Sequence, residues 1–188
     1  MSIMILNNNI SNILENFATD YNKKIYGRDV AKKLKMNQKT VSNILNKLEK
    51  ENILKFSFEG KNKYYYLNNL DQNIKEIIKL IEISRKIKFI EKYKSFKDLF
   101  NKLESRIEGI IGIFGSYANF SANKKSDLDV LIIGENREIK DLEQLYNIKI
   151  NIVNIDKYKF DKGDTLIREI IKNHVILKGV EQFIELIW

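Results

Sequence analysis

Apolar positions in the first third of the chain recur every three or four residues, which predicts amphipathic helices. The three stripes are Ile10 to Phe17, Val30 to Leu34 after Gly27, and Val41 to Leu48. Asn37 precedes the third stripe and is expected to cap that helix. The pattern then changes to apolar runs at 53–58 and 63–67, joined by a basic turn at 59–62. This change of period predicts a β-hairpin.

The middle of the chain predicts a helical connector. Residues 71–94 are rich in lysine and carry isoleucines at helical spacing, from Ile74 to Ile81 and again at Ile87 and Ile90. Ser95 is expected to cap a following helix, because Asp98 stands at its third position. No Gly- or Ser-rich linker occurs, so we expect the helices to join the flanking domains rigidly. The apolar stripe is expected to be covered by the C-terminal domain or by a second subunit.

Apolar runs and helical stripes alternate in the last part of the chain, which predicts an α/β domain. The expected strands are 110–114, 130–133, 148–155 and 175–177, and the expected helices are 140–146, 164–173 and the C-terminal segment from Val180 to Ile187. His174, the only histidine, stands between a helix and an apolar run. We expect it to pack in the core or to cap the helix, not to bind a metal.

Two acids open the second of these strands. Asp127 and Asp129 are two residues apart, so their side chains are expected on one face of the strand. Like charges this close repel unless a cation lies between them, and Mg²⁺ takes carboxylate and phosphate oxygens as ligands. Gly115 and Ser116 end the preceding strand, and a glycine followed by helix-start amides and a hydroxyl suits a phosphate.

The segment GSYANFSANKKSDLD resembles the signature of the polymerase-beta-like nucleotidyltransferase superfamily, most of all its minimal members. The resemblance covers roughly residues 107–188. It implies that Asp127 and Asp129 bind Mg²⁺ or Mn²⁺ and are catalytic, and that Gly115 and Ser116 bind the phosphates of a nucleoside triphosphate. It also implies two-metal transfer of a nucleoside monophosphate, in a domain with a mixed sheet.

The chain departs from that family in two places. Active members carry a third carboxylate on a neighbouring strand, and the matching position here is Asn151, an amide that can ligate a metal without supplying charge. Asp156, the nearest acid, follows at the end of that strand. Asn119 stands where relatives carry an arginine, and Lys124 and Lys125 are the candidates to replace its charge at the nucleotide. The sequence therefore leaves open whether the domain is an enzyme.

The order of helices and hairpin over residues 1–70 resembles a winged helix-turn-helix. The resemblance implies binding of double-stranded DNA by the third helix, in the major groove. The exposed residues expected to contact bases or phosphates are Gln38, Lys39, Ser42, Asn43, Asn46 and Lys47, with Lys61 and Lys63 on the hairpin reaching the backbone. A dimerisation or protein-docking module is the alternative. The polar face of this helix, without an acid before Glu49, favours DNA.

Charge supports this division. The chain has 188 residues and a net charge of +8. Residues 1–70 carry 12 Lys or Arg against 6 Asp or Glu, whereas residues 108–188 carry 11 against 13. An excess of basic residues in the N-terminal part is expected if that part binds a polyanion. There is no cysteine, which excludes disulfides and thiolate metal sites, and no apolar run long enough for a membrane. A cytoplasmic protein is expected.

The sequence thus predicts a two-domain α+β protein with three parts. Residues 1–70 form a winged helix-turn-helix, residues 71–106 a helical connector and residues 107–188 an α/β nucleotidyltransferase domain. Two functions are open. The first is nucleotidyl transfer to a protein or another acceptor, including antitoxin-like adenylylation of a toxin-like partner. The second is transcription regulation by a DNA-binding protein whose degenerate domain senses nucleotide. A homodimer would suit DNA with two-fold symmetry.

Overall fold

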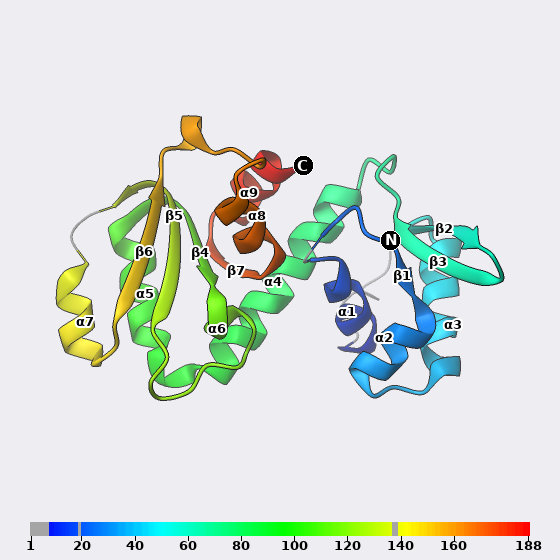
Figure 1. Ribbon diagram of the computed structural model, residues 1–188, viewed down its shortest axis with the longest axis horizontal. Helices are drawn as coiled ribbons and strands as arrows, with labels where there is room; N and C mark the ends of the chain where they lie inside the picture. Colours follow the sequence, from blue (N-terminus) through cyan, green and yellow to red (C-terminus); the bar gives the residue numbers. More distant parts are fainter. Residues whose placement is uncertain (1–7, 19, 137–138) are drawn as a thin grey trace. The chain divides into compact units, whose positions relative to one another are not determined.

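The chain folds into two compact units, Met1–Ile81 and Glu82–Trp188. The computed structural model describes residues 8–18, 20–136 and 139–188 (Figure 1). The division between the units falls inside helix α4 (Ile74–Lys92), within the segment expected to be a connector. Among the described residues, no helix is long and apolar enough to cross a bilayer. Each unit is described by itself below.

In the described part of the first unit, three α-helices and a small antiparallel sheet of order β1-β3-β2 precede α4. Its elements are α1 (Asn8–Leu14), the 3₁₀ turn η2 (Glu15–Phe17), β1 (Ile25–Tyr26), α2 (Gly27–Leu34), α3 (Gln38–Lys50), β2 (Leu54–Glu59) and β3 (Asn62–Leu67). The predicted cap at Asn37 is confirmed, because its side chain accepts hydrogen bonds from the amides of Lys39 and Thr40. The predicted hairpin is also present, with its turn at Gly60 and Lys61.

The second unit is a mixed four-stranded sheet with helices, as expected for its α/β pattern. Its elements after α4 are η3 (Lys94–Phe96), α5 (Lys97–Arg106), β4 (Ile107–Phe114), α6 (Gly115–Ala118), β5 (Leu128–Asn136), α7 (Lys140–Tyr146), β6 (Ile150–Ile155), η4 (Lys157–Lys159), α8 (Thr165–Lys172), β7 (His174–Lys178) and α9 (Val180–Ile187). The strand order is β6-β5-β4-β7. Strand β4 is antiparallel to β5 and β7, whereas β5 and β6 are parallel.

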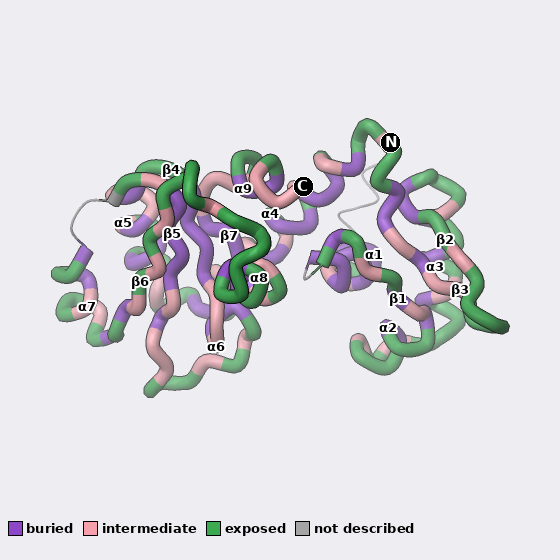
Figure 2. Tube along the Cα trace, turned by 45° about the horizontal axis from the view of Figure 1, so that its top comes forward, coloured by how far each residue is buried: buried purple, intermediate pink, exposed green. Residues whose placement is uncertain are grey.

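Alternation along β5 divides the core of this unit in two. Leu128, Val130 and Ile132 pack with residues of α5 and α7 on one face of the sheet. Leu131 and Ile133 pack with residues of α8 and α9 on the other face. Figure 2 shows the buried positions running along the central strands. Asp127 and Asp129 precede Leu131 and Ile133 at intervals of two residues. Alternation therefore places the two acids on the same face of the sheet, which α8 and α9 cover.

The segment expected to be a connector supplies core to the second unit. Phe89, Tyr93, Leu99, Phe100 and Leu103 are buried with the sheet residues. Two details of the prediction are wrong. Ile87 is 52% exposed, because the buried stripe of the second half of α4 shifts to Phe89. Ser95 is not a helix cap, because the 3₁₀ turn η3 occupies its position and α5 begins after Phe96 without a side-chain cap.

His174 lies at the start of β7 and is fully buried, as the packing prediction required. Its ring stacks against Phe183 at 4.8 Å between centroids, and its Nδ1 lies 2.6 Å from the carbonyl oxygen of Ile171 at the end of α8. Its Nε2 lies 3.4 Å from a carboxylate oxygen of Glu82, which is fully buried as well. Arg85 donates to the His174 carbonyl at 2.5 Å. The histidine therefore joins α4 to the sheet through a buried polar cluster.

Candidate functional site

The register of β5 and β6 sets the two acids beside polar residues of the neighbouring strand. Asp129 pairs with Asn151 in the parallel ladder, and Leu128 pairs with Ile150. The Asn151 amide nitrogen donates to Asp129 Oδ1 at 2.9 Å and to Asp127 Oδ2 at 3.4 Å. A single side chain thus bridges both carboxylates. The acids face the same side of the sheet, as their spacing predicted.

Gly115 lies directly against the second acid. It follows Phe114, which pairs with Asp129 across the β4–β5 ladder. Its φ is +66°, in the left-handed region that favours glycine, and a Cβ built there would come within 2.2 Å of Asp129 Oδ2. The turn between β4 and α6 therefore approaches the carboxylate as closely as only a glycine permits.

Backbone and side-chain hydrogen bonds hold this turn in place. The Asn173 side chain donates to the Gly115 carbonyl at 3.0 Å, linking the turn to the residue before β7. The Ser116 carbonyl accepts from the amides of Ser121 and Ala122 at 3.0 and 3.1 Å. The loop between α6 and β5 is thereby folded back onto Ser116. Gly115, Ser116 and the acid pair form a preorganised cluster at the ends of β4 and β5.

Lys149 neutralises part of the charge of this cluster. Its ammonium lies 2.9 Å from Asp127 Oδ2, and the two side chains are 67% and 38% exposed. Hydrogen bonds from Lys149 first and Asn151 second hold the pKa of Asp127 below its usual range. The same hydrogen bond to Asp127 raises the pKa of Lys149. At neutral pH the pair is therefore fully ionised.

The donor set fits a hard divalent cation. Two carboxylates face one side, and rotation of the terminal amide of Asn151 presents its oxygen in place of its nitrogen. Within the described residues, no group of three or more His, Cys, Asp or Glu side chains is gathered for a metal. The position of β6 that pairs with Asp129 carries the amide Asn151 and not a carboxylate.

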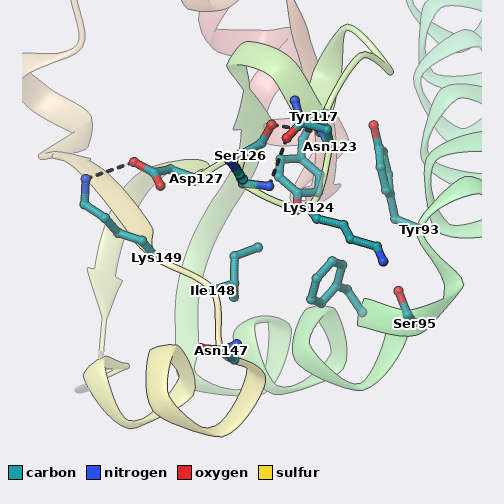
Figure 3. Close-up of a pocket in the computed structure, with 13 residues that line it drawn as sticks. Tyr93, Ser95, Tyr117, Asn123, Lys124, Ser126, Asp127, Asn147, Ile148 and Lys149 are labelled. Carbon is teal, nitrogen blue, oxygen red and sulfur yellow. Dashed lines mark hydrogen bonds and ion pairs between the residues drawn. The ribbon is translucent and has the colours of Figure 1, made fainter.

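Lys124 and Lys125 lie in the loop before β5 and share a pocket with one of the two acids. Together with Asp127 and Lys149 they line a pocket of about 500 Å³. Its wall includes Tyr93 and Tyr117, whose burial raises their pKa values and which belong to the α5 side of the sheet. Figure 3 shows the Lys124 side chain extending towards Ser95. No ion pair among the described residues joins Lys124 or Lys125 to either acid.

Sequence reasoning missed Lys149 and Asn173. The signal for Lys149 was available, because it precedes Asn151 by two residues just as Asp127 precedes Asp129. Because β5 and β6 are parallel in this register, Lys149 and Asn151 lie beside Asp127 and Asp129. Asn173 carried no such signal, because only the β4–β7 pairing brings it to Gly115.

The residues expected to contact DNA lie on α3 and on the hairpin of the first unit. Gln38, Lys39, Asn43, Lys47 and Lys61 are exposed. Asn46 and Lys63 instead contact each other, because the Asn46 side-chain oxygen accepts from Lys63 at 3.1 Å and from the Tyr65 hydroxyl at 2.7 Å. The Lys63 ammonium lies 4.1 Å from the centre of the Phe56 ring. These contacts fix the hairpin against α3.

Residues 93–181 match the nucleotidyltransferase domain family. Among curated proteins, none matches the chain.

Two solved structures resemble parts of the chain. One is AntR, an antimony-specific transcriptional repressor, with 22% identity and a TM-score of 0.38 over 48% of this chain and 74% of that one. The other is a toxin–antitoxin with AMP-PNP, with 17% identity and a TM-score of 0.34 over 55% and 77%. TM-scores this low do not establish a shared overall fold.

Proposed function

We propose that the second unit binds Mg²⁺ or Mn²⁺ with a nucleoside triphosphate and transfers a nucleoside monophosphate to an acceptor. The observation that carries the proposal is the bridging of Asp127 and Asp129 by Asn151 directly beside the Gly115 turn. Carboxylates that converge next to backbone amides suit a cation bound to phosphates. The family match over residues 93–181 supports the same chemistry.

Each part of the cluster has a role in this proposal. Asp127 and Asp129 hold the cation with help from Asn151, and the cation would neutralise charge that develops on the transferred phosphoryl group. Ser116 and the amides after Gly115 bind the terminal phosphates. Lys124 and Lys125 line the pocket that Asp127 and Lys149 also line, and in this proposal they contact the nucleotide there.

Transfer of label from ATP tests this function. The protein is incubated with α-labelled ATP, Mg²⁺ and cell lysate, and label on protein, RNA and small molecules is measured. We expect the wild-type protein to transfer label and Asp129→Asn to transfer none. Asp161→Asn, which changes an exposed acid, is the control and should transfer label as the wild type does. A labelled protein band identified by mass spectrometry would support the antitoxin-like version with a toxin-like partner. Absence of any Asp129-dependent label contradicts transfer.

A second function is favoured by Asn151 and by Asn119, which replaces the arginine found in relatives. Without the third carboxylate, the domain could bind nucleotide without turning it over and so act as a sensor in a transcriptional regulator. This version predicts Asp129-dependent ATP or GTP binding without transfer. It also predicts DNA affinity that changes when nucleotide is added. Unchanged DNA affinity at saturating nucleotide contradicts it.

We further propose that the first unit is a winged helix-turn-helix that binds double-stranded DNA. Its support is the element order, with α2 and α3 joined by a short turn at Lys35–Asn37 and followed by the β2–β3 hairpin. Its charge and the exposed polar face of α3 agree with such a role. A homodimer would allow two such units to address a symmetric site.

Salt-dependent DNA binding tests this assignment. Affinity for mixed-sequence duplex is measured at several salt concentrations for the full chain and for Lys39→Ala combined with Lys61→Ala. We expect weaker binding and a salt slope reduced by about 2 for the double variant. The control Lys157→Ala removes a charge from the second unit and should leave both unchanged. No binding at low salt, or equal slopes, contradicts the proposal.

A further inference from the structure

Lys149 and Asn151 occupy the β6 positions beside the two acids. Extending the parallel ladder by one pair from Leu128 and Ile150 sets Asp127 beside Lys149, and the next pair on the same face is Asp129 with Asn151. The observed contacts follow this pairing, at 2.9 Å from Lys149 to Asp127 and 2.9 Å from Asn151 to Asp129. Each carboxylate therefore faces one donor from the same neighbouring strand.

The charges of these four side chains limit how many cations the site can hold. Two carboxylates supply two negative charges, Asn151 supplies none, and the Lys149 ammonium removes one. Pairs of divalent cations clamping a transferred phosphate carry four positive charges, which the protein offsets with several carboxylates. Within the described residues no third acid joins this cluster. The net negative charge of these side chains therefore suits one divalent cation in addition to the Lys149 ammonium, and not two.

Resting on the proposed function, we propose that the site takes a single divalent cation and that Lys149 supplies the second positive charge. The ammonium is a compact point charge with three donors, of which Asp127 uses one. The remaining donors can meet a phosphate oxygen of the nucleotide. Asp127 then orients Lys149 in addition to facing the cation, which Asp129 and Asn151 also hold.

Counting bound Mn²⁺ tests this directly and does not depend on turnover. Free Mn²⁺ is measured by electron paramagnetic resonance while the full chain is titrated with one equivalent of a non-hydrolysable ATP analogue, and the analogue alone is the blank because its phosphates bind Mn²⁺ themselves. We expect one Mn²⁺ per chain. In a titration without nucleotide, Lys149→Gln should still bind one Mn²⁺ but roughly tenfold more tightly, because a cation beside the metal's ligand has been removed. Lys157→Gln, an exposed lysine of the same unit, is the matched control and should behave as wild type.

The reciprocal variant restores the missing acid. Asn151→Asp combined with Lys149→Gln gives the site three carboxylates and no ammonium, and we expect it to bind two Mn²⁺. Circular dichroism verifies that each variant is folded. Two saturable, Asp129-dependent ions in the wild-type protein would overturn the single-cation inference, as would an unchanged Mn²⁺ affinity in Lys149→Gln.

Failure of the proposed function gives a different result. If neither Asp127→Asn nor Asp129→Asn alters Mn²⁺ or nucleotide binding by the wild-type chain, the acid cluster is not a cation site at all. Two ions that depend on Asp129 leave the function standing and remove only the role given to Lys149.

Discussion

The backbone of Gly115 approaches the carboxylate of Asp129 so closely that a Cβ at Gly115 would come within 2.2 Å of Oδ2. The two residues lie on adjacent antiparallel strands, where Phe114 pairs with Asp129. The positive φ of Gly115 turns the chain sharply at that point, and the turn leads straight into Ser116. The acid and the turn therefore have fixed positions relative to each other.

Gly115→Ala is expected to damage the site as well as the stability of the second unit. The left-handed backbone costs an alanine roughly 1–2 kcal/mol, and the new methyl group must push the Asp129 carboxylate away. We expect Mn²⁺ affinity to fall at least about tenfold, since a displaced ligand loses its geometry. Affinity is measured by the same Mn²⁺ titration.

Gly60→Ala is the matched control for this change. Gly60 has a φ of +59° and no atom within 4 Å of an added Cβ, so it suffers the same backbone strain without a clash. It should keep wild-type Mn²⁺ affinity. If Gly115→Ala and the wild type had equal Mn²⁺ affinities, the Asp129 carboxylate could move away from the new methyl group without losing the metal, which would contradict this prediction.

His174→Ala is expected to destabilise the second unit by about 2–4 kcal/mol. The substitution leaves a cavity against Phe183 and removes one contact of the buried Glu82 carboxylate. Unfolding in urea can be followed by the fluorescence of Trp188, the only tryptophan, which lies in this unit. The exposed control Lys172→Ala should change stability little, and a loss below about 0.5 kcal/mol for His174→Ala would contradict the buried cluster's importance.

Asp98 is expected to make the stability of the second unit depend on pH. Hydrogen bonds from Tyr146 first and Lys102 next lower the pKa of Asp98 in the folded state. A depressed carboxyl pKa stabilises the fold above the unfolded-state pKa, and this stabilisation is lost as pH falls through the folded-state value. Asp98→Asn should therefore be less stable than wild type at pH 7, and the gap should close in acid.

Urea unfolding at pH 7 and at about pH 2–3 measures this gap. Asp161→Asn controls for the loss of an exposed acid on the same unit. A gap between wild type and Asp98→Asn that stays constant over this range would show that the Tyr146 and Lys102 contacts do not favour the ionised form.

Asn37→Ala is expected to weaken the start of α3 by about 1 kcal/mol. The Asn37 side-chain oxygen accepts from the amides of Lys39 and Thr40 at 2.8 and 3.4 Å, and alanine cannot replace it. Faster hydrogen exchange at these two amides is the local readout. Asn43→Ala, on the exposed face of the same helix, should not speed their exchange. Unchanged protection in Asn37→Ala would mean that the first turn of α3 is held by other contacts.

Local patterns in the sequence determined most of the elements. The cap at Asn37, the hairpin after α3 and the strands on either side of the Gly115–Asp129 segment follow from residues close together in the chain, because capping and alternation are local effects. The same alternation put Asp127 and Asp129 on one face. Ser95 failed as a cap because the chain after Tyr93 forms a 3₁₀ turn, with the partly buried Phe96 packed against the core.

Tertiary structure alone decided what surrounds the acids. Strand order and register bring Lys149 to Asp127 and Asn151 to both carboxylates, and the β4–β7 pairing brings Asn173 to Gly115. The tertiary structure also buries Glu82 beside His174, which lies 92 residues away in the chain. The sequence specified the chemical groups through short-range patterns. Their partners depended on long-range strand pairing, whose register is set by the packing of the whole sheet.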